Sequence, residues 1–570
     1  MRTPEATEEH PGQEPDFQPG EYSHAQIMRI LTGLMMGMFL GSLDQTIVST
    51  AIRTIADDLH GLSVQAWVTT AYLITSTIAT PIYGKLGDMW GRKKLFMFAI
   101  TVFIIGSALC AFSTSMYMLA AFRAIQGIGA GGLFTLSLAI IGDIVAPRER
   151  AKYSGYMMAM FGSSSVLGPV IGGVFAGATS ILGVAGWRWV FLVNVPLGII
   201  ALYVVWRTLH LQSHRQHASV DWMGAAALVV ALVPLLTVLE QGREWGWDST
   251  QSVLCFVTAA LGVVAFVIIE HRMQGDALIP LSIFRIRAAS VTIAASVIVG
   301  MAMFGGMMVL PLYMQIVHGA TPMESGFMML PMVLGLMFAS TGSGLITART
   351  GKIRGFPMVG SLVMSASLLL LSTIDADTEL WQVMLIMALL GFGLGNCMQP
   401  LLIILQNAVP PQQIGVATSS ATFFRQIGGT IGVAIFLSVL FSTVGGNIAT
   451  EVQQAAKEPT FQATLHDPEV MADPINREVG AALSGQAEHG GVLAKVQDDS
   501  SILEKMNPVL SHPFRAGFAE SMAAVFLYAG YIGLASFLIM LLIPKVTLRE
   551  KSAAAAAQSE AAEATVSGGH

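Results

Sequence analysis

Residues 84–112 read GKLGDMWGRKKLFMFAITVFIIGSALCAF, and this stretch sets the structural class of the chain. A short polar segment with four basic residues ends at Lys94, and the 18 residues from 95 to 112 then contain no charged side chain. As a helix rising about 1.5 Å per residue, such a run is roughly 27 Å long, close to the ~30 Å hydrocarbon core of a bilayer. The stretch therefore predicts a loop at the membrane surface followed by a membrane-spanning helix.

The same alternation of apolar runs and short polar loops extends along the chain. Apolar residues make up 54% of the 570 residues and charged residues 12%, about half the charged share of a typical soluble domain. All three cysteines lie in apolar runs, so neither a disulfide framework nor a zinc site is expected. We predict an all-α integral membrane protein with fourteen transmembrane helices. The predicted spans are 27–50, 66–84, 95–112, 117–143, 153–178, 188–206, 221–240, 252–270, 289–314, 324–346, 356–373, 380–407, 416–441 and 520–543.

Basic residues gather in the loops on one side of this arrangement. If the N-terminus is cytoplasmic, the inside loops hold most of them, whereas the short outside loops hold little beyond Arg243. By the positive-inside rule, both termini are predicted to be cytoplasmic, in a multi-pass protein of an inner or plasma membrane. The polar segments 1–24 and 552–570 are predicted to be disordered tails. The inside residues are Lys85, Arg92, Lys93, Lys94, Arg148, Arg150, Lys152, Arg207, Arg215, Arg272, Arg285, Arg287, Arg349, Lys352 and Arg354.

One sequence frame occurs twice. Residues 344–354 read GLITARTGKIR and repeat the two glycines and the following bases of 84–94, although Ala348 replaces Asp88. A duplication predicts two pseudo-symmetric six-helix bundles with two further helices inserted between them. Chance similarity of two basic, glycine-containing loops is the alternative. The predicted first bundle, inserted pair and second bundle are 25–206, 207–288 and 289–551.

One long polar segment, 442–519, is predicted to lie outside the membrane between the last two helices. It is net acidic and contains short patterned stretches such as 501–509. An inert helical loop accounts for these features. A gating role, or a site for a periplasmic or extracellular partner, is the alternative.

Asp44 and Arg123 are charged residues inside predicted spans. Asp44 lies in LDQTIV at 43–48, and Arg123 lies in RAIQG at 123–127. An ionised carboxylate at membrane depth costs about 2.5–3.5 kcal/mol, so Asp44 needs a cavity or a partner, and a buried guanidinium needs an acceptor. Burial favours the neutral form of a carboxyl group, which makes the two residues a candidate proton-coupling site. A proton carrier here has to be uncovered to each side of the bilayer in turn. A fixed structural acid and a static ion pair are the alternatives.

Other motifs exclude several classes of function. Residues 127–132 match G-x-G-x-x-G, but they lie in an apolar helix with no strand before it, so close helix packing is favoured over nucleotide binding. The sequence contains no Gly-x4-Gly-Lys-Ser/Thr loop and no recognisable nucleophile–base pair. These patterns indicate neither an ATP-driven transporter nor an enzyme. We expect no cofactor, no metal site and no nucleic-acid partner.

Small residues and methionines predict adaptable surfaces. Gly168, Pro169, Gly172 and Gly173 in the fifth span suit bending and close helix approach, although a merely kinked helix is the alternative. The chain has 33 methionines, and flexible thioethers suit a cavity for varied apolar ligands, with simple gap filling as the alternative. Candidate cavity residues are Met38, Gln126, Met160, Met307, Gln315, Met332 and Arg425.

Together these motifs resemble the major facilitator superfamily, and within it the fourteen-helix drug:proton antiporter family. The similar segments cover the helix-1 motif, the loop between helices 2 and 3, the helix-4 motif, the helix-5 antiporter motif, the start of helix 6 and a motif of helix 13. They are, in that order, 43–48, 84–94, 123–127, 168–173, 187–198 and 425–429.

The resemblance implies alternating access by rocking of two bundles, driven by proton entry. Asp44 and Arg123 would couple protonation to this motion, and Asp88 would hold a cytoplasmic gate in one state. The implied partners are a lipophilic small-molecule substrate, protons and membrane lipid. The gate residues that the resemblance implies are Gly84, Asp88, Gly91, Arg92 and Lys93.

The predicted function is therefore proton-coupled export of lipophilic small molecules or drugs. A dedicated exporter of a lipid or an endogenous metabolite would use the same fold. A non-transporting membrane sensor or assembly factor that uses 442–519 to hold a partner is a further alternative.

Overall fold

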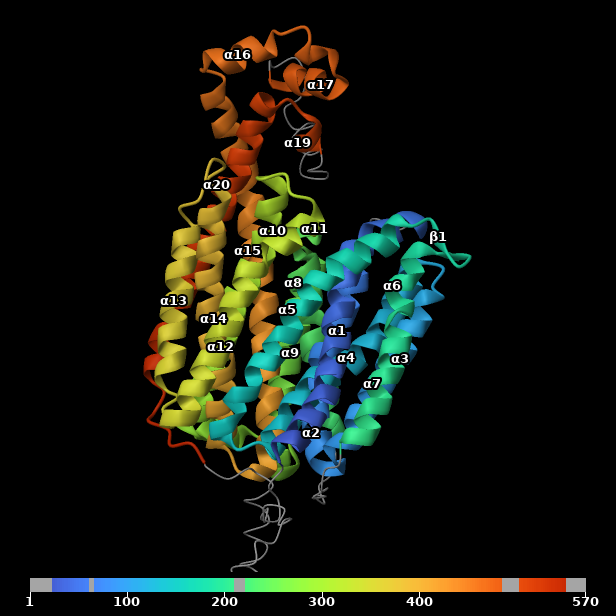
Figure 1. Cartoon of the computed structure of the whole chain (residues 1–570), viewed down its shortest axis with the longest axis vertical. Helices are drawn as coiled ribbons and strands as arrows, with labels where there is room; N and C mark the ends of the chain where they lie inside the picture. Colours follow the sequence, from blue (N-terminus) through green and yellow to red (C-terminus); the bar gives the residue numbers. More distant parts are fainter. Residues whose placement is uncertain (1–22, 61–65, 210–220, 484–501, 550–570) are drawn as a thin grey trace, which may run out of the picture.

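The computed structural model describes residues 23–60, 66–209, 221–483 and 502–549, so the predicted tails lie almost entirely outside the described residues. Most described residues are helical, and the long helices stand side by side beneath a smaller helical cap (Figure 1). A two-residue hairpin, β1 (Ser180–Ile181) and β2 (Val184–Ala185), was not predicted. The long helices are α1 (His24–Asp58), α2 (Ala66–Trp90), α3 (Arg92–Ala111), α4 (Met116–Ile144), α5 (Pro147–Gly177), α7 (Asn194–Thr208), α8 (Trp222–Trp245), α9 (Thr250–Met273), α10 (Arg287–Ile316), α12 (Leu330–Thr350), α13 (Gly355–Leu371), α14 (Leu380–Ala408), α15 (Ile414–Ala455) and α20 (Pro508–Leu541).

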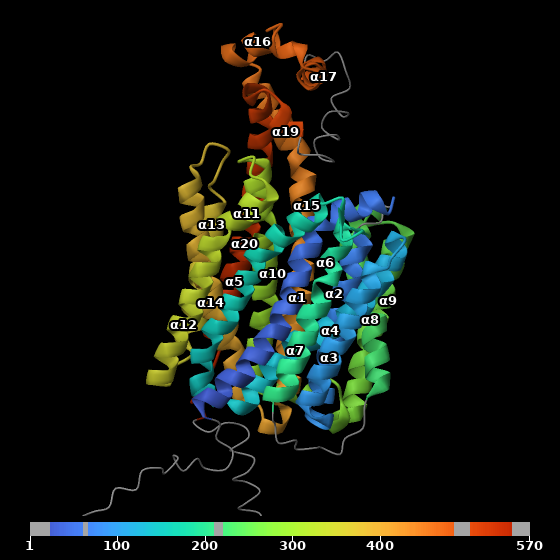
Figure 2. The ribbon, with the colours of Figure 1, turned by 45° about the vertical axis from the view of Figure 1, so that its right-hand side comes forward.

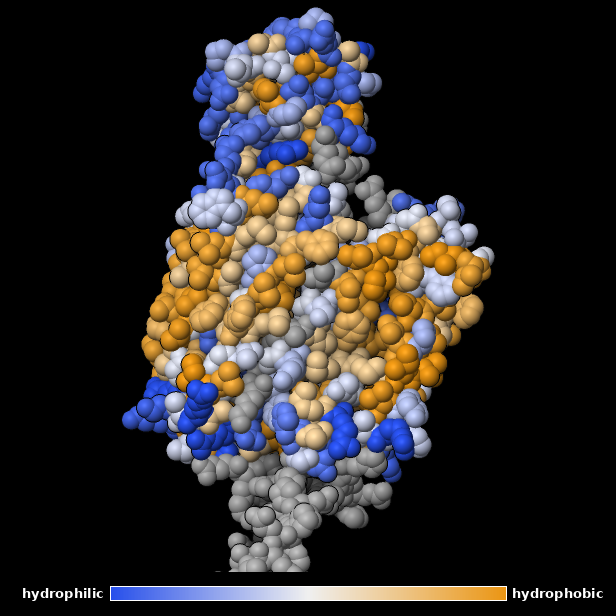
Figure 3. All heavy atoms as spheres, viewed as in Figure 1, coloured by the Kyte–Doolittle hydropathy of each residue, from blue (hydrophilic) through white to orange (hydrophobic). Residues whose placement is uncertain are grey.

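Within the described residues, twelve helical segments are long and apolar enough to cross a membrane. Two of them join neighbouring elements: α7 with the short α6 (Trp189–Leu192), and α12 with α11 (Pro322–Met328). The predicted count of fourteen included two more helices. One is α2, whose 25 residues include several threonines and Lys85, and the other is the apolar but 17-residue α13. On the face of the bundle that Figure 3 shows, an apolar belt lies between hydrophilic side chains at both ends.

Two sets of helices repeat one pattern of neighbours. In the first set, α1 packs on α4, α5 and α7, and α4 packs on α2 and α3. In the second set, α10 packs on α14, α15 and α20, and α14 packs on α12 and α13. The equivalent helices are those that the duplicated sequence frame relates to each other. We call these sets the first and second half.

The duplicated frame has a conformational basis in its second glycine. Gly91 separates α2 from α3 with φ 93°, and Gly351 ends α12 with φ 69°. Both values lie in the left-handed region, which favours glycine because it has no Cβ. Each glycine therefore turns the chain sharply between two spans.

The two inserted helices pair with each other beside the first half. α8 and α9 pack together, and α8 also contacts α2 and α15 (Figure 2). Asp221 caps α8 by accepting a hydrogen bond from the backbone N–H of Gly224. Glu270 near the end of α9 accepts from the backbone N–H groups of Leu278 and Ile279 and so fixes the chain that returns to α10.

The polar segment after the thirteenth predicted span is shorter than expected. α15 continues to Ala455, and α20 begins at Pro508, so both helices extend past their predicted ends at 441 and 520. Between them lie α16 (Pro459–Leu465), α17 (Pro474–Leu483) and α19 (Ile502–Lys505), which form the cap (Figure 1). Phe461, Leu503 and Leu510 are buried in one apolar cluster there. We call the end of the bundle beneath this cap the cap end, and the opposite end, where α1 begins and α20 ends, the terminal end.

Candidate functional site

A buried ion pair joins α1 to α4. Arg123 Nη1 donates to Asp44 Oδ2 at 2.6 Å, and the two side chains are 1% and 0% exposed. Gln126 Nε2 and Asn194 Nδ2 donate to Asp44 Oδ1 at 2.8 and 2.7 Å. Asp44 and Arg123 are therefore in direct contact, and the carboxylate has three donors from α4 and α7. Their role in proton coupling stays a prediction. A buried pair is stable only when such additional hydrogen bonds satisfy its charges.

The guanidinium side of the pair is also enclosed. Arg123 Nη1 donates to Gln126 Oε1 at 2.7 Å, and the guanidinium lies over the Tyr72 ring, 4.0 Å from its centroid. Ser107 on α3 accepts from Gln126 and lies 3.3 Å from Asn194 Nδ2. Gln126, a candidate cavity residue by sequence, lies inside this network. Ser107 and Tyr72 also belong to it and were not among the predicted site residues.

The network lies inside the first half and not between the halves. Its members come from α1, α2, α3, α4 and α7, and Asp44 has no exposed surface. In this conformation Asp44 is therefore not accessible from either side of the membrane, as a proton carrier would have to be. The helices of the first half have to move apart before Asp44 can exchange a proton with water.

A second charged cluster closes the terminal end between α2 and α15. Arg92 Nη2 donates to Asp88 Oδ1 and Arg92 Nη1 to Asp143 Oδ2, both at 2.8 Å. Asp88 Oδ2 accepts from the backbone N–H of Val416 at 3.1 Å, in the first turn of α15. A carboxylate is stabilised there because the unpaired N–H groups of a helix N-terminus carry partial positive charge. Asp143, which sequence analysis missed, holds Arg92 from α4.

The remaining predicted gate residues have distinct positions. Gly84 lies against Ser419 of α15, where a Cβ would overlap the serine side chain. Gly91 forms the turn described above, and Lys93 Nζ donates to the carbonyl of Trp206 at 3.0 Å, away from α15. Gly84 and Asp88 thus belong to the contact between the halves. Arg92 holds Asp88 from within the first half, and Lys93 braces α3 against α7.

Further hydrogen bonds join the halves at the same end. Arg150 Nη1 on α5 donates to Gln406 Oε1 on α14 at 2.6 Å, and Arg150 is 4% exposed. Arg148 donates to the carbonyls of Ala348 and Arg349 at the end of α12, at 2.7 and 3.1 Å. The terminal end is therefore closed by contacts from α2, α4 and α5. Arg148 and Arg150 were predicted as basic residues of an inside loop. The sequence around Gln406 does not indicate that it accepts a hydrogen bond from Arg150.

The small residues of α5 line a close contact with α1. Gly168 lies against Thr46, whose hydroxyl donates to the Ser164 carbonyl at 3.1 Å. Gly172 faces Ile47 and Thr50, Pro169 faces Gly326 of α11, and Gly173 has open space around it. α5 therefore touches α1 on one side and the second half on the other, as small residues permit.

The other candidate cavity residues are spread over both halves. Met38 and Met332 are 1% and 2% exposed and belong to separate apolar cores. Met160 lines a groove of about 260 Å³ with Met35 and Phe39. Met307 packs on the second core, Gln315 Nε2 donates to Ser325 Oγ at 3.4 Å, and Arg425 packs against Gly300 of α10. This conformation does not gather them into one cavity, and their role in binding stays a prediction.

Comparison with known proteins gives one consistent result. A sequence model described as the Major Facilitator Superfamily matches residues 34–433. Multidrug transporter protein MdtP of Bacillus subtilis (strain 168) is 36% identical over 423 residues, which cover 74% of this chain and 76% of that protein. Multidrug resistance protein 3 of the same strain is 34% identical over 481 residues, covering 82% and 92%. A solved structure of the proton:xylose symporter XylE superposes with a TM-score of 0.57 at 14% identity, covering 92% of this chain and 97% of that one, which is a likeness of fold alone.

Proposed function

This chain belongs to the Major Facilitator Superfamily, and on that premise we propose that it is a proton-driven exporter of lipophilic small molecules. Superfamily members are transporters and not enzymes, and similar proteins carry the names of multidrug transporters. The observation that carries the proposal is the Asp44–Arg123 pair, an ionisable carboxylate enclosed at membrane depth. Ionisable residues inside transmembrane segments mark proton relays and substrate pathways.

We further propose fourteen spans, with α2 and α13 completing two six-helix bundles and with α8 and α9 inserted between them. The repeated neighbour pattern of the two halves supports this division. The terminal end would face the cytoplasm, because basic residues gather there at the ends of α3, α7, α10 and α12. The closed contacts at this end then correspond to a transporter shut towards the cytoplasm.

The coupling scheme follows from the burial of Asp44. In the closed state the carboxylate is neutralised by Arg123 and sealed from water. Protonation removes its charge, weakens the pair and frees α1 and α4 to move relative to each other. A rigid structural pair is the alternative that the same contacts support, because the carboxylate's hydrogen bonds are already satisfied.

The decisive experiment is transport by purified protein in lipid vesicles, with a panel of lipophilic dyes, drugs and lipids. An imposed pH gradient should drive accumulation, and an ionophore that collapses the gradient should abolish it. One charge crossing ~150 mV releases roughly 3.5 kcal/mol, which sustains about a 300-fold gradient of a neutral ligand. Transport that is unaffected by the ionophore would contradict proton coupling, and transport of lipids alone would narrow the cargo to that class.

Asp88→Asn should slow turnover several-fold while changing substrate affinity little. The amide keeps the size of the side chain but loses the charge that attracts Arg92 and the α15 N-terminus, contacts worth about 0.3–1 kcal/mol each for an exposed group and more when buried. Initial rates in vesicles and equilibrium dye binding to the same preparation measure the two effects separately. A loss of affinity with unchanged turnover would remove Asp88 from the gate.

A further inference from the structure

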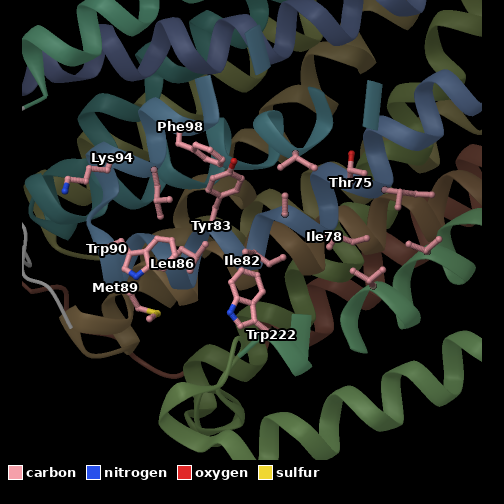
Figure 4. A pocket seen from close by; sticks show the side chains of 16 residues that line it. Thr75, Ile78, Ile82, Tyr83, Leu86, Met89, Trp90, Lys94, Phe98 and Trp222 are labelled. Atoms are coloured by element: carbon pink, nitrogen blue, oxygen red, sulfur yellow. The ribbon is translucent and has the colours of Figure 1, made fainter. Parts of the chain in front are cut away.

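A long apolar groove runs along the outside of the first half, beside the inserted helices. It has a volume of about 1010 Å³ and lies between α2, α3 and α8 (Figure 4). Its α2 wall extends from Ile74 to Trp90, and these 17 residues of helix measure roughly 25 Å. The groove therefore covers most of the depth of a ~30 Å hydrocarbon core.

The groove walls are almost entirely hydrocarbon. Ile78, Ile82 and Leu86 face it from α2, Phe98 from α3 and Val229 from α8. Phe98 is 55% exposed and Val229 40% exposed. Among the residues that the structure describes, no acidic side chain lines the groove. Such a surface is stable only when acyl chains or another apolar molecule fill it.

Two tryptophans and one lysine line the terminal end of the groove. Trp90 at the end of α2 and Trp222 at the start of α8 line it there, as the interfacial position of indole rings predicts. Lys94 in the first turn of α3 is the charged residue of the lining, and it is exposed. Its neighbour Lys93 donates to the Trp206 carbonyl, and Arg92 pairs with Asp88. Within the described part of the chain, Lys94 has no hydrogen-bond or ion-pair partner.

We propose that this groove binds one phospholipid with an anionic headgroup, the acyl chains lying between α2, α3 and α8 and the phosphate beside Lys94. The unpaired ammonium supplies the charge complementarity, and the two tryptophans lie at headgroup level. The length of the groove suits a chain better than a compact drug, which would cover only part of the wall. The lipid would fill the space between the first half and the inserted helices, whatever the protein transports.

The test is lipid retention by the full-length protein. Purified protein is equilibrated with equal amounts of phosphatidylglycerol and phosphatidylcholine of identical chains, and bound lipid is counted by native mass spectrometry. One basic residue near an anionic headgroup is worth about 1 kcal/mol, so wild type should retain phosphatidylglycerol about five-fold over phosphatidylcholine. Lys94→Gln should bring the ratio to about one.

Matched controls separate this site from general lipid adhesion. Arg207→Gln removes another exposed charge, at the end of α7, and should leave the ratio at about five. Val229→Trp should fill the groove and lower retention of both lipids, whereas Val257→Trp on the outward face of α9 should not. An unchanged ratio in Lys94→Gln, or an equal fall in Arg207→Gln, would overturn the proposal.

Discussion

Asp44→Asn is expected to lower the substrate gradient that vesicles sustain from as much as ~300-fold to about one. Asparagine keeps the shape of the side chain, and its carbonyl oxygen can still accept hydrogen bonds from Asn194 and Gln126. It has no carboxyl group that could bind and release a proton. The measurement is dye accumulation under an imposed pH gradient, normalised to the amount of inserted protein. Normal accumulation by this variant would remove Asp44 from the mechanism.

A double variant separates coupling from a purely structural role of the pair. Removing one partner of a buried pair costs about 3–5 kcal/mol, so the single variant should also lower thermal stability. Asp44→Asn/Arg123→Gln removes both charges and should recover much of that stability. If stability returns and pH-driven transport does not, the pair carries the coupling. If both return, the pair is a structural contact, and the coupling scheme is wrong.

Burial of Asp44 also constrains the motion that transport requires. Its partners lie on α4 and α7, inside the first half, so rocking of two rigid halves would leave the carboxylate sealed. Coupling therefore requires movement of α1 relative to α4 or α7 in addition to rocking. A hydrophobic carbodiimide, which reacts with accessible protonated carboxyl groups, should label Asp44 during turnover and not in the closed state. No labelling in either condition would count against proton exchange at this residue.

The fold class was predictable because apolar runs of membrane length and the positive-φ glycines are local signals. Gly84–Gly91 and Gly344–Gly351 identify equivalent loops without any knowledge of packing. The ends of α15 and α20 were not predictable from hydropathy, because polar residues continue both helices beyond the apolar belt. Hydropathy also fails to mark α2, which is not among the twelve clearly apolar spans. The middle of α2 contains threonines and a serine, and these residues are tolerated because α2 packs against α4.

Some residues of the candidate site were also predictable from the sequence, and others were not. Asp44 and Arg123 were visible as charges in apolar runs, and their mutual contact follows from the cost of isolating either one. Asn194 is 150 residues from Asp44 in sequence, and only the fold brings its amide to the carboxylate. Gln126 was a candidate cavity residue, but in this conformation its amide bridges Asp44 and Arg123. The sequence around a neutral polar side chain does not indicate which group will be its hydrogen-bond partner.

Gly84→Ala is the second substitution with a large expected effect, because α2 and α15 meet there without room for a methyl group. An added Cβ would overlap the Ser419 side chain and lie 3.0 Å from the Gly415 carbonyl oxygen. Overpacking costs about 1–3 kcal/mol in the closed state only, so it should shift the equilibrium towards an open terminal end about 5- to 150-fold. Spin labels at Arg207 and Arg287, exposed at the ends of α7 and α10, would report the change as a longer distance.

Ser419→Gly supplies the matched rescue, since it removes the atoms that the new methyl group meets first. The double variant Gly84→Ala/Ser419→Gly should regain most of the closed population, and Ser419→Gly alone should change it little. Because the Asp88 contact with Val416 lies one turn further along α2, the rescue should restore that gate contact as well. Unchanged label distances in Gly84→Ala would show that the α2–α15 contact does not set the closed state. A failure of the rescue would show that the methyl group acts through the Gly415 backbone and not through Ser419.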